Sequence, residues 1–131
     1  MVKKWIIMIS LSIILIVACI IETNYVNKSF KWLINSLETL QIEISESKDK
    51  INEEEFIDFA YKIHEDWHER VKILKCLIWH SGIKDVEIGL ARIAVYIKEN
   101  DYAEASAEIG SLIDYLAHYL DDFVISTENI F

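Results

Sequence analysis

The residues with the clearest potential for chemistry are two histidines in the segment HEDWH, residues 64–68. On a helix, positions four apart share one face, so His64 and His68 could bind one zinc ion through their imidazole nitrogens. Glu65 would then serve as the general base toward a zinc-bound water. The spacing raises one enzymatic hypothesis, a small zinc-dependent hydrolase.

The surroundings of this motif favour a structural role instead. In zinc proteases the residue after the glutamate is normally apolar, because it packs behind the metal, whereas here it is Asp66. A third ligand would have to be His80 or Glu87, and neither spacing is a familiar one. With Trp67 on a buried face, the two histidines would flank that face and pair with carboxylates, or bind metal without catalysis. We expect no catalytic residue, cofactor or dedicated metal ion, and keep the hydrolase as the alternative.

The location of these residues depends on an apolar run from Trp5 to Ile21, which contains no charge, proline or glycine. As a helix it would be about 25 Å long, at the short end of what crosses a bilayer. Two lysines precede it, and lysines at a short end predict that end in the cytoplasm. We therefore expect residues 1–4 inside, a transmembrane helix over 5–21 in the lipid bilayer, and residues 22–131 outside the bacterial cytoplasmic membrane.

The same run also fits a lipoprotein signal. Residues 16–19, IVAC, resemble a lipobox, in which Cys19 would receive a diacylglyceryl group after cleavage. Ile20 and Ile21 extend the apolar stretch past the cysteine, where a polar tether would be usual, so the uncleaved single-pass span is favoured. Both alternatives place the domain outside the membrane.

The composition of the chain excludes several classes of protein. With 22 acidic against 13 basic residues and a net charge of −9, it is a poor partner for nucleic acid. The two cysteines are Cys19, in the apolar run, and Cys76, so the domain can form no internal disulfide outside the membrane. Proline is absent and there are only 3 glycines, too few turn residues for a sheet-rich domain. These features predict an all-α fold.

Apolar residues recur at helical spacing and predict an up-down antiparallel bundle of about four helices. Polar residues 45–49 end the first helix; Asn52 then caps a second helix that ends at Ser81 and Gly82, and a third starts near Ile83. The expected buried positions are Phe30, Leu33, Leu37, Leu40, Ile44, Phe56, Ala60, Ile63, Trp67, Val71, Leu74, Ile78, Val86, Leu90, Ile93, Ile97, Ala105, Ile109, Leu112, Leu116, Leu120 and Phe123.

A tight turn at Asn100 and Asp101 makes the third and fourth helices an antiparallel hairpin, with Asp101 and Glu104 as a capping box. This hairpin would bring His118 near His80, which raises the hypothesis of a shared contact or a pH-sensitive pair.

Two glycines, Gly89 and Gly110, lie in the third and fourth helices of this hairpin. They are either points of close backbone approach or tolerated surface positions.

The overall pattern resembles one bacterial family, the domain-of-unknown-function family 4363 of small proteins from Firmicutes. The resemblance rests on the N-terminal span, a mid-domain tryptophan, a histidine that opens the third helix, an Asp-x-x-x-Ala-x-x-Glu turn-helix and a closing Asn-Ile-Phe. The matching residues are Trp67, His80, Asp101, Ala105, Glu108, His118, Asn129, Ile130 and Phe131. Membership implies the architecture and the membrane location, and it implies no mechanism.

The function that the sequence favours is a membrane-tethered, non-enzymatic interaction, scaffold or sensing domain at the cell envelope. Its partners would be the bilayer and an envelope protein. The apolar end of the chain, Ile130 and Phe131, suggests a segment that docks into a groove of this bundle or of a partner, and we favour the bundle. A third possibility is a ligand-sensing bundle with a cavity between its helices.

Overall fold

The computed structural model describes the backbone of residues 1–74 and 80–128, and the side chains of residues 1–74 and 82–122. It contains four helices: α1 (Val2–Ser45), α2 (Glu54–Leu74), α3 (His80–Lys98) and α4 (Tyr102–Glu128). No strand occurs within the described ranges. The prediction of an all-α chain of four helices is confirmed.

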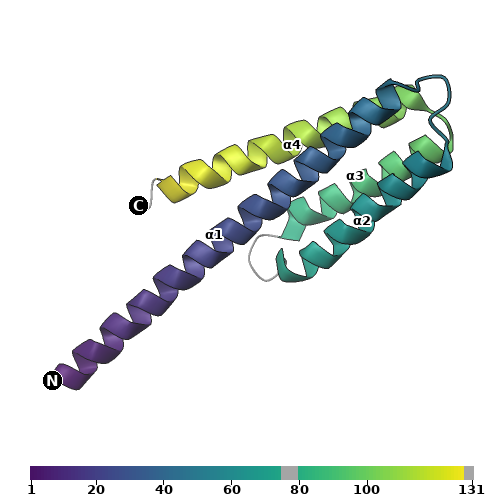
Figure 1. The fold of residues 1–131 in the computed structure, drawn as a ribbon. Coiled ribbons are helices and arrows are strands. Elements are labelled where there is room, and N and C mark those ends of the chain that lie inside the picture. Colours follow the sequence, from purple (N-terminus) through teal and green to yellow (C-terminus); the bar gives the residue numbers. More distant parts are fainter. Residues whose placement is uncertain (75–79, 129–131) are drawn as a thin grey trace.

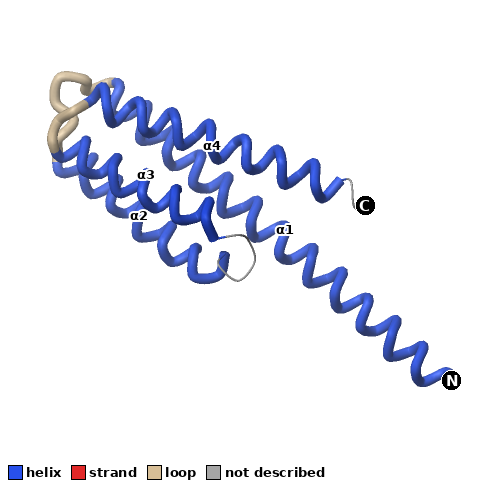
Figure 2. Tube along the Cα trace, turned by 180° about the vertical axis from the view of Figure 1, so that it is seen from behind, coloured by secondary structure: helices blue, strands red, loops and turns tan. Residues whose placement is uncertain are grey.

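The four helices pack in a ring, so that each contacts two neighbours. α1 packs on α2 and α4, and α3 packs on the same two helices from the other side. Consecutive helices run in opposite directions, which gives the expected up-down bundle (Figure 1). The N-terminal half of α1 extends beyond the bundle, as both views show (Figure 2).

The core of the bundle consists of the apolar positions that the helical spacing predicts. All of them that lie among the described side chains are buried except Leu120, which is half-buried. Ile51, Ile83 and Ala94 join them. Two of the expected positions, Ile78 and Phe123, lie outside the described side chains.

The long first helix has no break between its two halves. Two hydroxyl groups in or beside its apolar stretch bond within the helix: Ser12 Oγ donates to the Met8 carbonyl at 2.9 Å and Thr23 Oγ1 to the Cys19 carbonyl at 2.8 Å. Such bonds remove the cost of placing a hydroxyl in an apolar medium. α1 ends at Ser45, where the polar segment 45–49 was expected to end it.

Two predicted helix boundaries are wrong. α2 begins at Glu54, and the backbone N–H groups of Phe56 and Ile57 bond to the Glu53 carbonyl, so Asn52 is not its cap. The predicted end of the second helix is also wrong, because α3 begins at His80; the described part of α2 runs to Leu74.

Ser81 and Gly82 therefore lie in the first turn of α3 instead of ending α2. A Cβ added to Gly82 would lie 2.8 Å from the hydroxyl of Tyr115 of α4, which is the far end of an exposed side chain that can move aside, so this position does not require glycine. A Cβ added to Gly89 would lie 3.4 Å from Leu112 of α4, and one added to Gly110 would lie 3.7 Å from Gln41 of α1. Both are ordinary contact distances, so neither position requires a close backbone approach. Gly89 is buried and Gly110 is half-buried.

The turn between α3 and α4 is formed by Asn100 and Asp101, as predicted, and it ends α3. Asn100 has a φ of 58°, and the N–H groups of Asn100 and Asp101 bond to the Ile97 and Tyr96 carbonyls, which is a Schellman ending. Asp101 Oδ1 accepts the Glu104 N–H at 3.1 Å, which is one half of the predicted capping box, whereas the Asp101 N–H bonds to the Tyr96 carbonyl and not to the Glu104 side chain.

Candidate functional site

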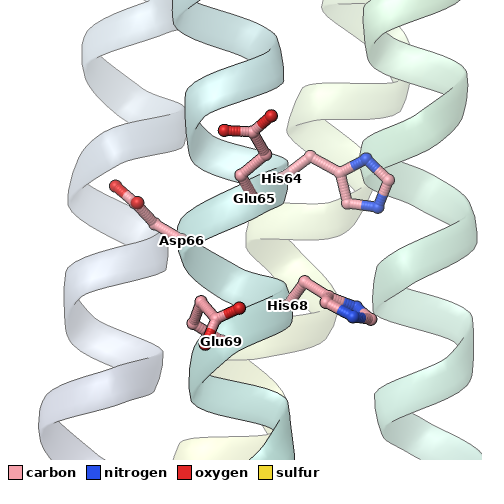
Figure 3. Close-up of a pocket in the computed structure, with 5 residues that line it drawn as sticks. All are labelled: His64, Glu65, Asp66, His68 and Glu69. Carbon is pink, nitrogen blue, oxygen red and sulfur yellow. The ribbon is translucent and has the colours of Figure 1, made fainter.

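The two histidines of the HEDWH segment lie on one side of α2. Figure 3 shows both imidazole rings extending from α2 toward α3, whereas Asp66 extends the opposite way. His64 is half-buried, and His68, Glu65 and Glu69 are exposed. The helix therefore presents both rings to the same neighbour, as the spacing of four predicts, but it places Glu65 on the solvent side.

His68 is held by a carboxylate of the neighbouring helix. Its Nδ1 lies 3.0 Å from Glu87 Oε1 of α3, and their side chains are 57% and 25% exposed. The sequence hypothesis considered Glu87 as a third metal ligand; in the structure it bonds directly to a histidine nitrogen. A histidine paired in this way keeps Nε2 as its remaining position for a ligand.

The five residues His64, Glu65, Asp66, His68 and Glu69 line a solvent-open depression of about 380 Å³. An open, hydrated surface leaves the charges of these groups screened and does not exclude water from a reacting centre. Among the side chains that the structure describes, no group of three or more histidine, cysteine, aspartate or glutamate residues could hold a metal ion. The zinc-hydrolase hypothesis gains no support from this geometry.

The charge of Glu69 is fixed by a neighbour on its own helix. Lys72 Nζ donates to Glu69 Oε1 at 2.9 Å, and this bond, together with the lysine charge, lowers the pKa of the Glu69 carboxyl below its usual value. Nearby His68 acts in the same direction and more weakly. Glu69 thus serves as an ion-pair partner in this depression.

Trp67 lies on the opposite, buried side of α2 and is fully enclosed. Its ring meets Phe30 of α1 edge-on, with centroids 5.6 Å apart, and Phe30 stacks on Tyr119 of α4 at 4.9 Å. These three rings join three helices. Neither Trp67 Nε1 nor the buried Asn27 Oδ1 has a hydrogen-bond partner among the described residues.

Burial and the nearby Tyr115 raise the pKa of the Tyr119 hydroxyl. Sequence reasoning placed Trp67 in the core correctly, but it did not identify Tyr119, because an aromatic residue beside a histidine gives no helical signal of its own.

The other residues that carry the family resemblance have structural roles where they are described. Asp101 caps α4, Ala105 is fully buried, and Glu108 Oε1 lies 3.8 Å from Arg92 Nη1 of α3. His118 is exposed on α4. His80 begins α3, as the resemblance implies. The His80 side chain, Cys76 and residues 129–131 lie outside the described part, so the His80–His118 pair and the docking of the apolar tail stay predictions.

The fold defines the class: an all-α, four-helix bundle whose first helix continues into an unpacked apolar segment. The chain belongs to the family described as Domain of unknown function (DUF4363), whose model matches residues 20–130. The match begins at residue 20, near the end of the exposed part of α1, and extends almost to the end of the chain. No curated protein and no solved structure matches this sequence.

Proposed function

We propose that this protein is a membrane-tethered helical domain that acts by interaction at the bacterial cell envelope, as a scaffold or sensor, and not as an enzyme. Residues 5–21 would cross the membrane, residues 1–4 would remain in the cytoplasm, and the bundle would stand outside. An envelope protein would be its partner.

The observation that carries the proposal is the contrast between the two halves of α1. Residues 2–21 are all exposed, including Trp5, Ile7 and Ile14, each more than 60% accessible. From Val26 onward, the inward residues of the same helix are buried. Burying one large apolar side chain contributes roughly 1.5–3 kcal/mol, so an entire bare segment strongly favours an apolar medium.

The dimensions and chemistry of the bare segment suit a bilayer. Among the described residues, α1 is the one helix long and apolar enough to cross a membrane, and none of its most apolar stretch is buried. A helical run of about 25 Å approaches the thickness of the hydrocarbon core. Tyr25 follows the run at the level where interfacial aromatic residues concentrate.

A non-enzymatic role agrees with the character of the polar groups. The side chains with the clearest potential for catalysis line an open depression, where His68 is paired with Glu87 and Glu69 with Lys72. The interior is filled by large side chains such as Trp67, Leu33 and Ile109, which supports scaffolding over binding of a small ligand within the bundle.

The tether is tested on the full chain expressed in a bacterium. We expect the protein to float with membranes and to resist carbonate extraction, and a protease added outside the cytoplasmic membrane to cleave the bundle. Mass spectrometry of the mature N-terminus should find Met1 or Val2, whereas a lipidated Cys19 at the N-terminus would replace the span by a lipid anchor. A freely soluble intact chain would overturn the proposal.

A further inference from the structure

The charge of the bundle is distributed unevenly along its axis. At the end far from the apolar segment, acidic residues dominate, among them Glu43, Glu53, Glu54, Glu55, Glu99 and Glu104. At the end from which α1 projects, exposed lysines occur on three helices: Lys28 on α1, Lys72 on α2 and Lys84 on α3. Arg70 lies among them.

Contacts between the helices show where these basic residues lie along the axis of the bundle. Arg70 Nη1 donates to Ser29 Oγ of α1 at 3.3 Å, and its guanidinium lies 4.4 Å from the Trp32 ring, so Arg70 is level with Lys28. Lys72 is two residues closer to the end of α2.

The bond between His68 and Glu87 sets the position of Lys84 along the bundle axis. Lys84 is three residues closer to the start of α3 than Glu87, and it therefore lies near the level of Arg70. Figures 1 and 2 show that α2 ends and α3 begins at the end of the bundle from which α1 emerges.

We propose that Lys28, Arg70, Lys72 and Lys84 form a basic collar that binds the anionic headgroups of phospholipids and holds the bundle upright on the bilayer. This inference rests on the proposed tether. Lys28 is seven residues beyond Ile21, or about 10 Å along the helix, so its flexible side chain can return to the headgroup layer. Lys72 and Lys84 lie at a similar level.

Acidic residues limit the collar to one side. Phe30 stacks on Tyr119, which places Asp121 and Asp122 of α4 near this level, and α4 carries no lysine or arginine. Within the collar, Glu69 pairs with Lys72 and Glu87 with His68, while Asp85 adjoins Lys84. Glu22 of α1 also lies at this end, directly after the apolar run. The attraction to an anionic surface therefore comes from the basic side chains on α1, α2 and α3, whereas the α4 side and the acidic far end are repelled by it.

The test uses the full chain reconstituted into vesicles of phosphatidylcholine with phosphatidylglycerol. Spin-labelled lipids report which headgroup is enriched next to the protein. The collar variant is K28E/K72E/K84E, and the matched control is K48E/K50E/K98E, which makes the same change of net charge at the far end. Arg70 is left intact because it contacts Ser29 and Trp32, and circular dichroism checks that both variants keep their helices.

We expect the native chain and the far-end control to enrich phosphatidylglycerol equally, and the collar variant to lose at least about half of that preference at low salt. Equal enrichment by all three proteins, or equal loss in both variants, overturns the collar. Failure of the collar is distinguishable from failure of the tether. An untethered chain would not float with vesicles of either lipid. A tethered chain without a collar would float and show no lipid preference dependent on these lysines.

Discussion

The side chain of Asn100 binds a loop that is far from it in the sequence: its Oδ1 accepts the backbone N–H of Ile51 at 2.8 Å. The amide nitrogen of Asn100 also donates to the Asp49 carbonyl at 3.3 Å. One residue therefore ends α3 with a positive φ and ties the α3–α4 turn to the α1–α2 loop. Ile51 itself is fully buried.

Replacement of Asn100 should separate these two roles. Asn100→Gly keeps the left-handed backbone and loses the bridge, so we expect a loss of about 1 kcal/mol in the free energy of unfolding. Asn100→Ala also strains the backbone and should cost about 2–3 kcal/mol. Urea unfolding of the full chain in detergent micelles, followed by circular dichroism, measures both. Equal stability of the two variants would contradict the strain argument.

The aromatic contact between α1 and α2 should be the most sensitive point of the core. Trp67→Ala removes a fully buried ring and its contact with Phe30, and we expect a cost of about 3–5 kcal/mol. Trp67→Phe should cost less than half as much, because it also removes an indole N–H that has no partner in the described part of the chain. The exposed Trp5 supplies the control, since Trp5→Ala should leave the unfolding transition of the bundle unchanged.

Stability at alkaline pH should depend on Tyr119. Because burial raises the pKa of this hydroxyl in the folded state, the fold favours the protonated form. Its contribution is fully present below the ordinary tyrosine pKa of about 10 and is lost as the pH rises through the higher folded value. Tyr119→Phe keeps the ring and removes the titrating group, so the variant should lose less stability than the native chain between about pH 9 and 12.

Thermal unfolding across this pH range measures the difference, with Tyr102→Phe at the other end of α4 as the control. If the native chain and Tyr119→Phe lose the same stability at alkaline pH, the loss does not come from ionisation of Tyr119, and the prediction is refuted.

Metal analysis tests the remaining enzymatic hypothesis. Protein purified without chelator or affinity tag should contain far less than one zinc per chain, because the described side chains offer His64 and His68 no third ligand. His68→Ala should then leave the metal content unchanged and lower stability by no more than about 1 kcal/mol, since its contact with Glu87 is exposed. Stoichiometric zinc that disappears in His68→Ala would restore the hydrolase.

The sequence was sufficient to predict the helices and the core because burial follows helical spacing. Leu33, Leu37 and Leu40 are buried where the spacing places them, and Asp101 caps α4 as its position before Glu104 indicates. The end of α2 was predicted wrongly, since apolar residues 76–78 continue its pattern and Gly82 resembles a terminator. In the structure Gly82 lies in the first turn of α3.

The candidate site was less predictable, because its contacts form between helices and not within one. The spacing of His64 and His68 correctly indicates a shared face, but their partners depend on how α2 packs against α3. Three contacts follow from the register in which the helices and loops pack: Glu87 with His68, Arg70 with Trp32, and Asn100 with Ile51. No local pattern of residue types encodes these pairs.

The absence of a hinge in α1 has a mechanical consequence. The helix runs without interruption from Val2 to Ser45, through the level where the bundle begins. With its apolar half embedded in a bilayer, any roll or tilt of that half would turn Phe30 and Leu33 inside the core, because no flexible joint separates them. Such a rod carries torque in both directions, and a load applied to the bundle would in turn reorient the embedded half.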